Sequence, residues 1–133
     1  MMRAVLADTG PLFAAADEDD SDHEKAVRQT DELDRHGLIV VVPYPILLEA
    51  YSLVLKRFGS NAALRWLGNA VDASLINPTP EDYSVACAFV RALSDQDISL
   101  VDATVAALAK RLNIEVWTYD HHFDVMRVPV WRG

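Results

Sequence analysis

Four carboxylate side chains occupy positions where a globular chain rarely places a charge: Asp8, Glu49, Asp102 and Asp120. Each interrupts or ends a strongly apolar run, in VLAD, PILLEAYSLVL, ISLVDATVAALA and VWTYD. Burying an ionised carboxylate costs several kcal/mol unless a cation or a hydrogen-bond donor compensates it. Because no Lys or Arg is comparably placed, the simplest explanation is a shared counter-charge from outside the chain, and a divalent metal ion would supply it.

Such a site supports a definite chemistry. Hard cations such as Mg²⁺ and Mn²⁺ prefer carboxylate and water ligands to imidazole or thiolate. A cation held in this way can activate a bound water and stabilise charge on a phosphate that is being cleaved. Thr9 and Thr118 each stand beside one of the acids and could hydrogen-bond a carboxylate or a water on the metal.

Each acid also fits an ordinary role when it is taken alone. Asp102 follows Ser99 at the spacing of a helix capping box. Asp8 and Asp120 could bond their own backbone in turns. A solvated helix face is a weaker explanation for Glu49, because its neighbours at helical spacing are mainly apolar. The coincidence of all four acids favours a common site.

The elements that must position these acids follow from the hydrophobic pattern. Apolar strand-like runs alternate with helix-like segments along the whole chain, which is typical of a parallel α/β sheet. Strands are expected at residues 3–7, 38–42, 74–76, 114–118 and 125–131, the last at a sheet edge because of Pro129. Helices are expected at residues 22–36, 45–58, 60–71, 80–93 and 100–112, after a short one opened by a turn at residues 8–11.

All four acids fall at strand-to-helix junctions or in the first turns of helices. In open parallel sheets, ligands bind beyond the carboxyl ends of the strands. Asp8 follows the first strand directly, and Asp120 lies just past the strand that contains Trp117. These two side chains should therefore meet if their strands are neighbours. The first long helix should begin with a Ser21–Glu24 capping box, and Ser60 should cap the helix at 60–71.

Length and composition narrow the class of protein. The 133 residues should form one domain, residues 1–133, and 51% hydrophobic with 24% charged residues is typical of a folded chain. Pro43 and Pro45 break the longest uncharged stretch, so no membrane span is expected. A single cysteine, Cys87, excludes an internal disulfide and is expected in the core. The cytoplasm is the expected location, since the charge at Asp8 comes too early for a secretory leader.

The net charge of −8 disfavours loose, sequence-independent attraction to nucleic acid, which depends on Lys and Arg. It does not exclude a nuclease, because a metal ion and a local basic rim can offset the background. The pairs Lys56-Arg57 and Lys110-Arg111 could form such a rim, but helix C-termini attract cations equally well. A transition-metal site at His121-His122 is disfavoured, because adjacent loop residues seldom bind one ion and no third His or Cys is suitably spaced.

The four acid-bearing blocks together match the pattern of a known protein family. VLADTGPLFAAAD, PILLEAYSLVL, ISLVDATVAALAKRL and VWTYDHHFD, in this order and spacing, resemble a PIN domain of the VapC toxin type. The resemblance covers nearly the whole chain, and it is specific because each block contributes one acid. It implies a three-layer α/β/α domain around a central, mainly parallel sheet. It also implies Mg²⁺- or Mn²⁺-dependent cleavage of RNA, with Asp8 and Asp102 as the principal metal ligands and Glu49 and Asp120 completing the acidic pocket.

The same resemblance implies partners. A small cognate antitoxin protein would occupy the acidic pocket or a nearby groove, and the chain would form a homodimer. The first block reads DTG where many relatives have DTS or DAS, so Gly10 lacks a hydroxyl that could support the site. Asp95, Asp97 and Asp124 flank the blocks and are expected to be mainly solvated.

Other acid-site folds fit less well. A haloacid-dehalogenase-like phosphatase needs a second aspartate where Gly10 stands, and a receiver domain needs a late lysine that the run Val116–Asp120 lacks. A catalytically silent PIN-like module that binds RNA or protein stays open, because the presence of the acids does not prove turnover.

Overall fold

In the computed structural model, which describes residues 3–133, four parallel strands form one sheet. Residues 1 and 2, at the start of the predicted domain, lie outside the described residues. The strands are β1 (Ala4–Ala7), β2 (Ile39–Pro43), β3 (Ser74–Ile76) and β4 (Glu115–Trp117), in the order β3-β2-β1-β4. Leu6 pairs with Val41 on one side and Val116 on the other, so β1 and β4 are neighbours as the placement of the acids requires.

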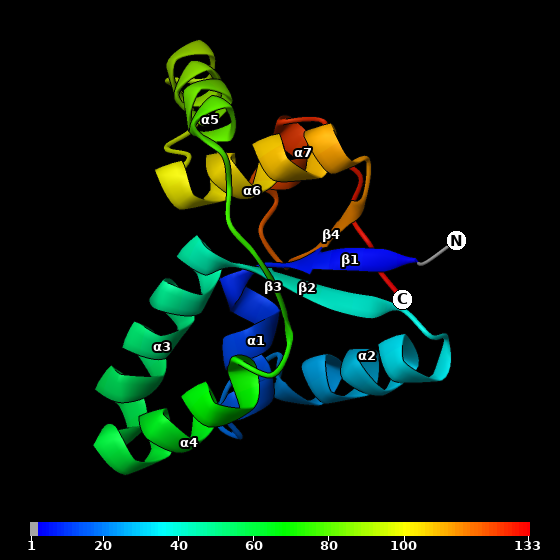
Figure 1. Ribbon diagram of the computed structural model, residues 1–133, viewed down its shortest axis with the longest axis vertical. Coiled ribbons are helices and arrows are strands. Elements are labelled where there is room, and N and C mark those ends of the chain that lie inside the picture. The colour runs from blue at the N-terminus through cyan, green and yellow to red at the C-terminus, as the bar shows by residue number, and fades with distance from the viewer. Residues whose placement is uncertain (1–2) are drawn as a thin grey trace.

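Helices cover both faces of this sheet. They are α1 (Thr9–Ala16), α2 (His23–Arg35), α3 (Tyr44–Phe58), α4 (Ser60–Ala70), α5 (Pro80–Ala92), α6 (Leu100–Leu112) and α7 (His122–Val125). Figure 1 shows α5, α6 and α7 on one side of the sheet and α1 to α4 on the other. The predicted three-layer α/β/α arrangement with a parallel sheet is confirmed. No helix within residues 3–133 is long and apolar enough to cross a membrane.

The core lies between β1 and the helices on each side. Val5, Leu6 and Ala7 are fully buried, as expected for a strand covered on both faces. Small side chains of α6, among them Ala103 and Ala106, are also fully buried and let the helix approach the sheet closely. The strand end that leads into Asp8 is therefore held rigidly.

An ion pair between a buried carboxylate and a half-exposed guanidinium joins α5 to α6. The Arg111 guanidinium donates to Asp82 Oδ1 from Nε at 2.8 Å and to Oδ2 from a terminal nitrogen at 2.9 Å. Asp82 also accepts from the Thr79 backbone N–H, and its own N–H donates to the Thr79 hydroxyl, which forms the predicted helix start. The Arg111 guanidinium holds the pKa of Asp82 below its usual range. This pair fixes the helix that carries Asp102 against its neighbour.

The predicted strand at residues 125–131 is wrong. His122–Val125 forms the short helix α7, which takes up the start of the predicted strand. Only Val130 forms a bridge, to Val116, where the Val116 N–H donates to the Pro129 carbonyl and the Trp131 N–H donates to the Val116 carbonyl. Pro129 has no N–H to donate, so the pairing cannot continue as a ladder.

Two predicted helix caps do not form. Helix α2 begins at His23 after Asp22, without a side-chain capping bond, and Ser21 lies outside it. The Asp20 carboxylate instead accepts the Asp22 N–H, which makes a turn of the segment before the helix. Ser60 is the first residue of α4 and not its cap, because Gly59 takes the capping position with φ +88°.

The predicted burial of Cys87 in the core is also wrong. Its side chain is only partly buried on α5. Ala86, the preceding residue, faces the core and is fully buried.

Candidate active site

Asp8 and Asp120 come together because their strands are neighbours. The Asp8 N–H donates to the Trp117 carbonyl at 2.9 Å, which extends the pairing of β1 and β4 by one residue. Asp8 is then the residue before α1 and is only 5% exposed, yet its side chain makes no capping hydrogen bond. Its carboxylate is therefore buried at the carboxyl edge of the sheet although it does not cap the helix.

The Thr118 hydroxyl links the two acids. It donates to Asp8 Oδ2 at 2.7 Å and accepts the backbone N–H of Asp120 at 3.0 Å. Thr118 is itself buried, so this hydroxyl is held in one place and sets the position of the Asp8 carboxylate.

Replacing Thr118 with Val should therefore weaken the site and the fold together. Loss of two buried hydrogen bonds should lower the free energy of unfolding by about 1–3 kcal/mol. Activity of the site should fall roughly 10- to 100-fold, the usual effect of losing a group that orients a ligand. Chemical denaturation and single-turnover rates would measure the two effects. Thr118→Ser retains the hydroxyl and should restore most of the activity; equal losses in both variants would contradict the role of the hydroxyl.

Asp102 faces the same edge from the first turn of α6. Its backbone N–H donates to the Ser99 hydroxyl at 3.0 Å, so the capping interaction uses the backbone of Asp102. Burial, the Asp8 charge and a hydrogen bond with Asp120 raise the pKa of Asp102 to about 8. Asp102 and Asp120 thus share a proton across the site.

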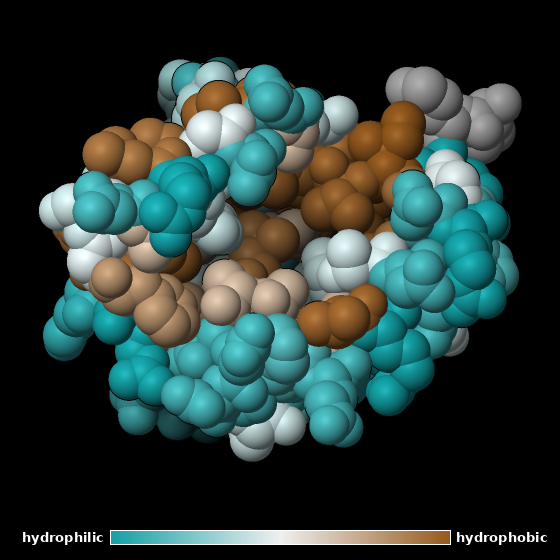
Figure 2. Space-filling model, turned by 90° about the horizontal axis from the view of Figure 1, so that it is seen from below, coloured by the Kyte–Doolittle hydropathy of each residue, from teal (hydrophilic) through white to brown (hydrophobic). Residues whose placement is uncertain are grey.

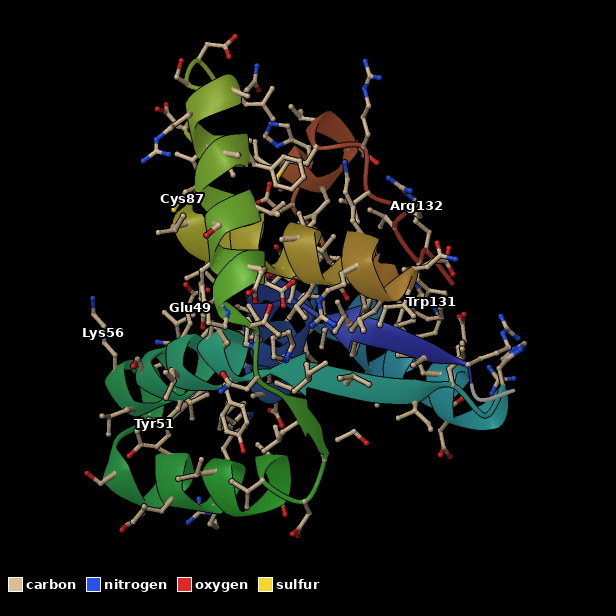
Figure 3. The ribbon with its side chains drawn as sticks, turned by 45° about the horizontal axis from the view of Figure 1, so that its top comes forward. Glu49, Tyr51, Lys56, Cys87, Trp131 and Arg132 are labelled. Carbon is tan, nitrogen blue, oxygen red and sulfur yellow. The ribbon has the colours of Figure 1, made fainter. Side chains whose placement is uncertain are left out.

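Asp8 and Glu49 are the other two acids of the cluster, and their charges also interact. Burial raises the pKa of Asp8 against the opposing effect of the Thr118 hydrogen bond, and the charges of Asp120 and Glu49 raise it further. Glu49 is therefore close enough for its charge to act on Asp8. Glu49 borders a groove whose opposite wall is Val101 of α6, and Figure 3 shows Glu49 on α3.

Burial also opposes the charge on Asp120, but its pKa is lowered. The hydrogen bond from Asp102, the His122 N–H and the two neighbouring imidazoles outweigh the burial. Asp120 is therefore the member of the carboxyl pair that carries the negative charge, and Asp102 carries the shared proton.

The donor set of this cluster suits a hard divalent cation. Asp8 Oδ1 and Thr9 Oγ1 are buried and have no hydrogen-bond partner among residues 3–133. A buried carboxylate oxygen without a partner is costly, and no Lys or Arg in the described part of the chain forms an ion pair with any of the four acids. Oxygen ligands with excess negative charge are what Mg²⁺ and Mn²⁺ require.

Both histidine side chains lie beside the Asp120 carboxylate. The His122 N–H donates to Asp120 Oδ1 at 2.9 Å, and His122 Nδ1 lies 3.3 Å from the same oxygen. Possible ligand atoms of Asp120, His121 and His122 all lie within 4.8 Å of one another. Within residues 3–133, no third His or Cys belongs to this group, and Asp120 is its third possible ligand. This edge of the site has nitrogen donors, which transition metals accept.

The remaining charges that the sequence singled out lie outside the acid cluster. Asp95 and Asp97 are exposed, and Asp124 pairs with Arg132 at 2.9 Å. Arg57 is 3.3 Å from carboxylate oxygens of both Asp17 and Asp19.

These ion pairs also bear on the predicted basic rim. Arg57 and Arg111 are both engaged with carboxylates of the chain itself. Lys110 lies over the Phe89 ring, 4.8 Å from its centroid. Three of the four members of the basic pairs are thus engaged by groups of the chain itself. At position 10, a β-carbon would meet only Tyr119 Cδ2, at 3.8 Å, so Gly10 leaves room for a side chain.

A pocket that the sequence did not indicate lies beside Asp120. Lys25 and Gln29 of α2, Tyr119 and Trp131 border it together with Asp120. The Trp117 indole N–H donates to Gln29 Oε1 across 88 positions of sequence. No local pattern could have indicated a contact of that range.

A parallel α/β domain whose acids converge at the carboxyl edge of its sheet defines the class of acid-site α/β domains. More specifically, the chain belongs to the PIN domain family, whose sequence model matches residues 5–129. No curated protein matches significantly in sequence.

Solved structures share the fold over almost the whole chain. One is VapC20 of Mycobacterium tuberculosis, described as a sarcin-ricin loop cleaving toxin (21% identity, TM-score 0.84, 97% of this chain and 99% of that chain). Another is VapBC2 of Rickettsia felis bound to a DNA fragment from their promoter (13% identity, TM-score 0.74, 96% of each chain). A toxin-antitoxin complex from Klebsiella pneumoniae is a third (15% identity, TM-score 0.59, 88% of this chain and 87% of that chain). At these identities the likeness establishes the fold alone.

Proposed function

We propose that this chain is a metal-dependent ribonuclease and the toxin of a toxin-antitoxin pair. The observation that carries this proposal is the buried Asp8 carboxylate, with one oxygen unpartnered and two further acids acting on it. The PIN domain match and the sarcin-ricin loop cleaving toxin among the structural relatives support RNA as the substrate.

In this proposal the chain's own residues hold the cation and the proton. Asp8 and Asp102 are the principal ligands of Mg²⁺ or Mn²⁺, and Glu49 and Asp120 complete the ligand set. The cation, when bound, provides charge for the cleaved phosphate and lowers the pKa of a water. Asp102 gives up its proton when the cation binds, because the ligand form of a carboxyl group is the ionised one. Thr118 keeps Asp8 in place throughout.

An antitoxin partner is supported by exposed apolar surface beside the acids. A groove of about 490 Å³ runs along α3 to Glu49 and is lined by Leu48, Leu53 and Val101. Figure 2 shows apolar side chains gathered around a hollow on the side of the molecule that carries α1 to α4. Surface of this kind is typical of protein contact sites. We also propose a homodimer and a cytoplasmic location, as the resemblance implies.

The direct test is cleavage of single-stranded RNA with Mg²⁺ or Mn²⁺, with EDTA, and with metal restored in excess. We expect cleavage with the metal, none with the chelator, and full recovery on restoration. Cleavage that persists in EDTA would exclude the metal mechanism. RNA binding without cleavage under every metal condition would identify the chain as a silent binding module instead.

A further inference from the structure

The pocket beside Asp120 has a volume of about 310 Å³ and shares Thr118 and Asp120 with the acid cluster. Its other walls come from α2, through Lys25 and Gln29, and from the C-terminal segment, through Trp131. A molecule bound across the acids therefore has a cavity next to it. In Figure 3, Trp131 lies on the opposite side of the molecule from Glu49. Among the residues described, the pocket is continuous with the acids only through the shared residues Thr118 and Asp120.

Gln29 presents a hydrogen-bond donor to this pocket. The residue is only 5% exposed, and its Oε1 accepts from the Trp117 indole N–H at 2.9 Å and from the Tyr119 hydroxyl at 2.7 Å. An indole N–H can only donate, and the Tyr119 hydroxyl is also placed as a donor to the same oxygen. These two donors fix which end of the amide faces them. The Gln29 Nε2 group is left on the other side, and no residue within 3–133 accepts its protons.

The neighbouring side chains add charge and an aromatic surface. Lys25 Nζ lies 4.5 Å from the centroid of the Tyr119 ring and forms no ion pair with any acid in the described ranges. Trp131 is partly exposed and packs at 88° against the Trp117 ring, which fixes its orientation. Proteins bind single-stranded nucleic acid with groups of these kinds. An amide donor bonds a base edge, an ammonium group neutralises a phosphate, and an indole ring stacks on a base.

We propose that this pocket binds the base of a nucleotide next to the phosphate that is cleaved at the acids, and that Gln29 reads that base. This inference rests on the proposed ribonuclease function. Because Gln29 can only donate into the pocket, it should favour uracil and guanine, which carry a carbonyl oxygen at ring position 4 or 6, over cytosine and adenine, which carry an amino group there. Trp131 stacks on the base, and Lys25 neutralises an adjacent phosphate.

The substitution Gln29→Glu tests this directly. A glutamate keeps an oxygen for the Trp117 and Tyr119 donors but replaces the amide donor with an acceptor. Thr30→Glu adds the same charge at the next, exposed position of α2 and serves as the matched control. Binding of labelled single-stranded tetranucleotides that differ in one base would be followed by fluorescence anisotropy in EDTA.

The unsubstituted protein should prefer guanine or uracil at one position by about tenfold, the size of one base contact. Gln29→Glu should reverse this preference towards cytosine or adenine, whereas Thr30→Glu should weaken all sequences alike. Trp131→Leu, which leaves Gln29 in place, should weaken every tetranucleotide by roughly tenfold. It provides a second result if Gln29→Glu does not fold.

The inference would be overturned if the unsubstituted protein had no base preference, or if Gln29→Glu and Thr30→Glu had the same effect. Wild-type affinity of Trp131→Leu would do the same. Because binding is measured without metal, a protein that never cuts RNA still gives an answer. Conversely, metal-dependent cleavage without base preference would refute the pocket and leave the proposed ribonuclease intact.

Discussion

Asp8→Asn should abolish RNA cleavage while leaving the metal-free protein at least as stable as before. Asparagine keeps an oxygen that can accept from the Thr118 hydroxyl, but it removes the charge that the proposed cation needs. Cleavage should fall at least about 100-fold, because even groups that only support metal ligands cost 10- to 100-fold. Stability should not fall, since burial raises the pKa of Asp8 and ionisation therefore works against folding.

Asp95→Asn makes the same chemical change at an exposed position outside the acid cluster and is the matched control. Single-turnover cleavage and thermal unfolding in EDTA would be measured for both variants. A large fall in the melting temperature of metal-free Asp8→Asn would show that Asp8 is a structural cap. Unchanged cleavage would remove Asp8 from the proposed mechanism.

The fold was predictable because its signals are local. The continuous apolar run that ends at Ala7 indicated a strand covered on both faces, and β1 lies at the centre of the sheet. The helix predicted from residue 80 begins there, because the Thr79–Asp82 capping hydrogen bonds all fall within one turn. The same pattern failed at Ser21, where the nearby Asp20 carboxylate accepts the Asp22 N–H and a turn forms instead.

The convergence of acids at one sheet edge could also be expected, because neighbouring parallel strands end at the same edge. What the sequence could not indicate depends on distant contacts. The Tyr119 hydroxyl donates to Gln29 across 90 positions, and nothing in either local sequence announces this bond. The coupling of Asp102 to Asp120 likewise follows from their distance in space, which alternating hydrophobicity does not encode.

The metal-free protein should lose stability between pH 5 and pH 8, and Mn²⁺ should reverse this trend. The pKa of Asp102 is about 8 in the folded protein, against an ordinary value of 3.8. Between these values the folded protein keeps a proton that the unfolded chain releases, so the free energy of unfolding falls as pH rises. Linkage over these three pH units amounts to about 4 kcal/mol. About a third of this is expected after allowance for solvent screening of the partly exposed carboxyl group, so the melting temperature in EDTA should drop by about 3–6 °C. Because a cation binds the ionised carboxylates, its stabilising effect should be larger at pH 8 than at pH 5.

Asp102→Asn separates this effect from the titration of the histidines, which all stay in place. In EDTA its melting temperature should change less with pH than that of the unsubstituted protein, and added Mn²⁺ should shift it little at either pH. Asp95→Asn should behave like the unsubstituted protein under every condition, because its exposed carboxyl group is outside the cluster. If metal-free stability instead rose from pH 5 to pH 8, or if Mn²⁺ stabilised Asp102→Asn as much as the original chain, Asp102 would not be the proton-bearing metal ligand.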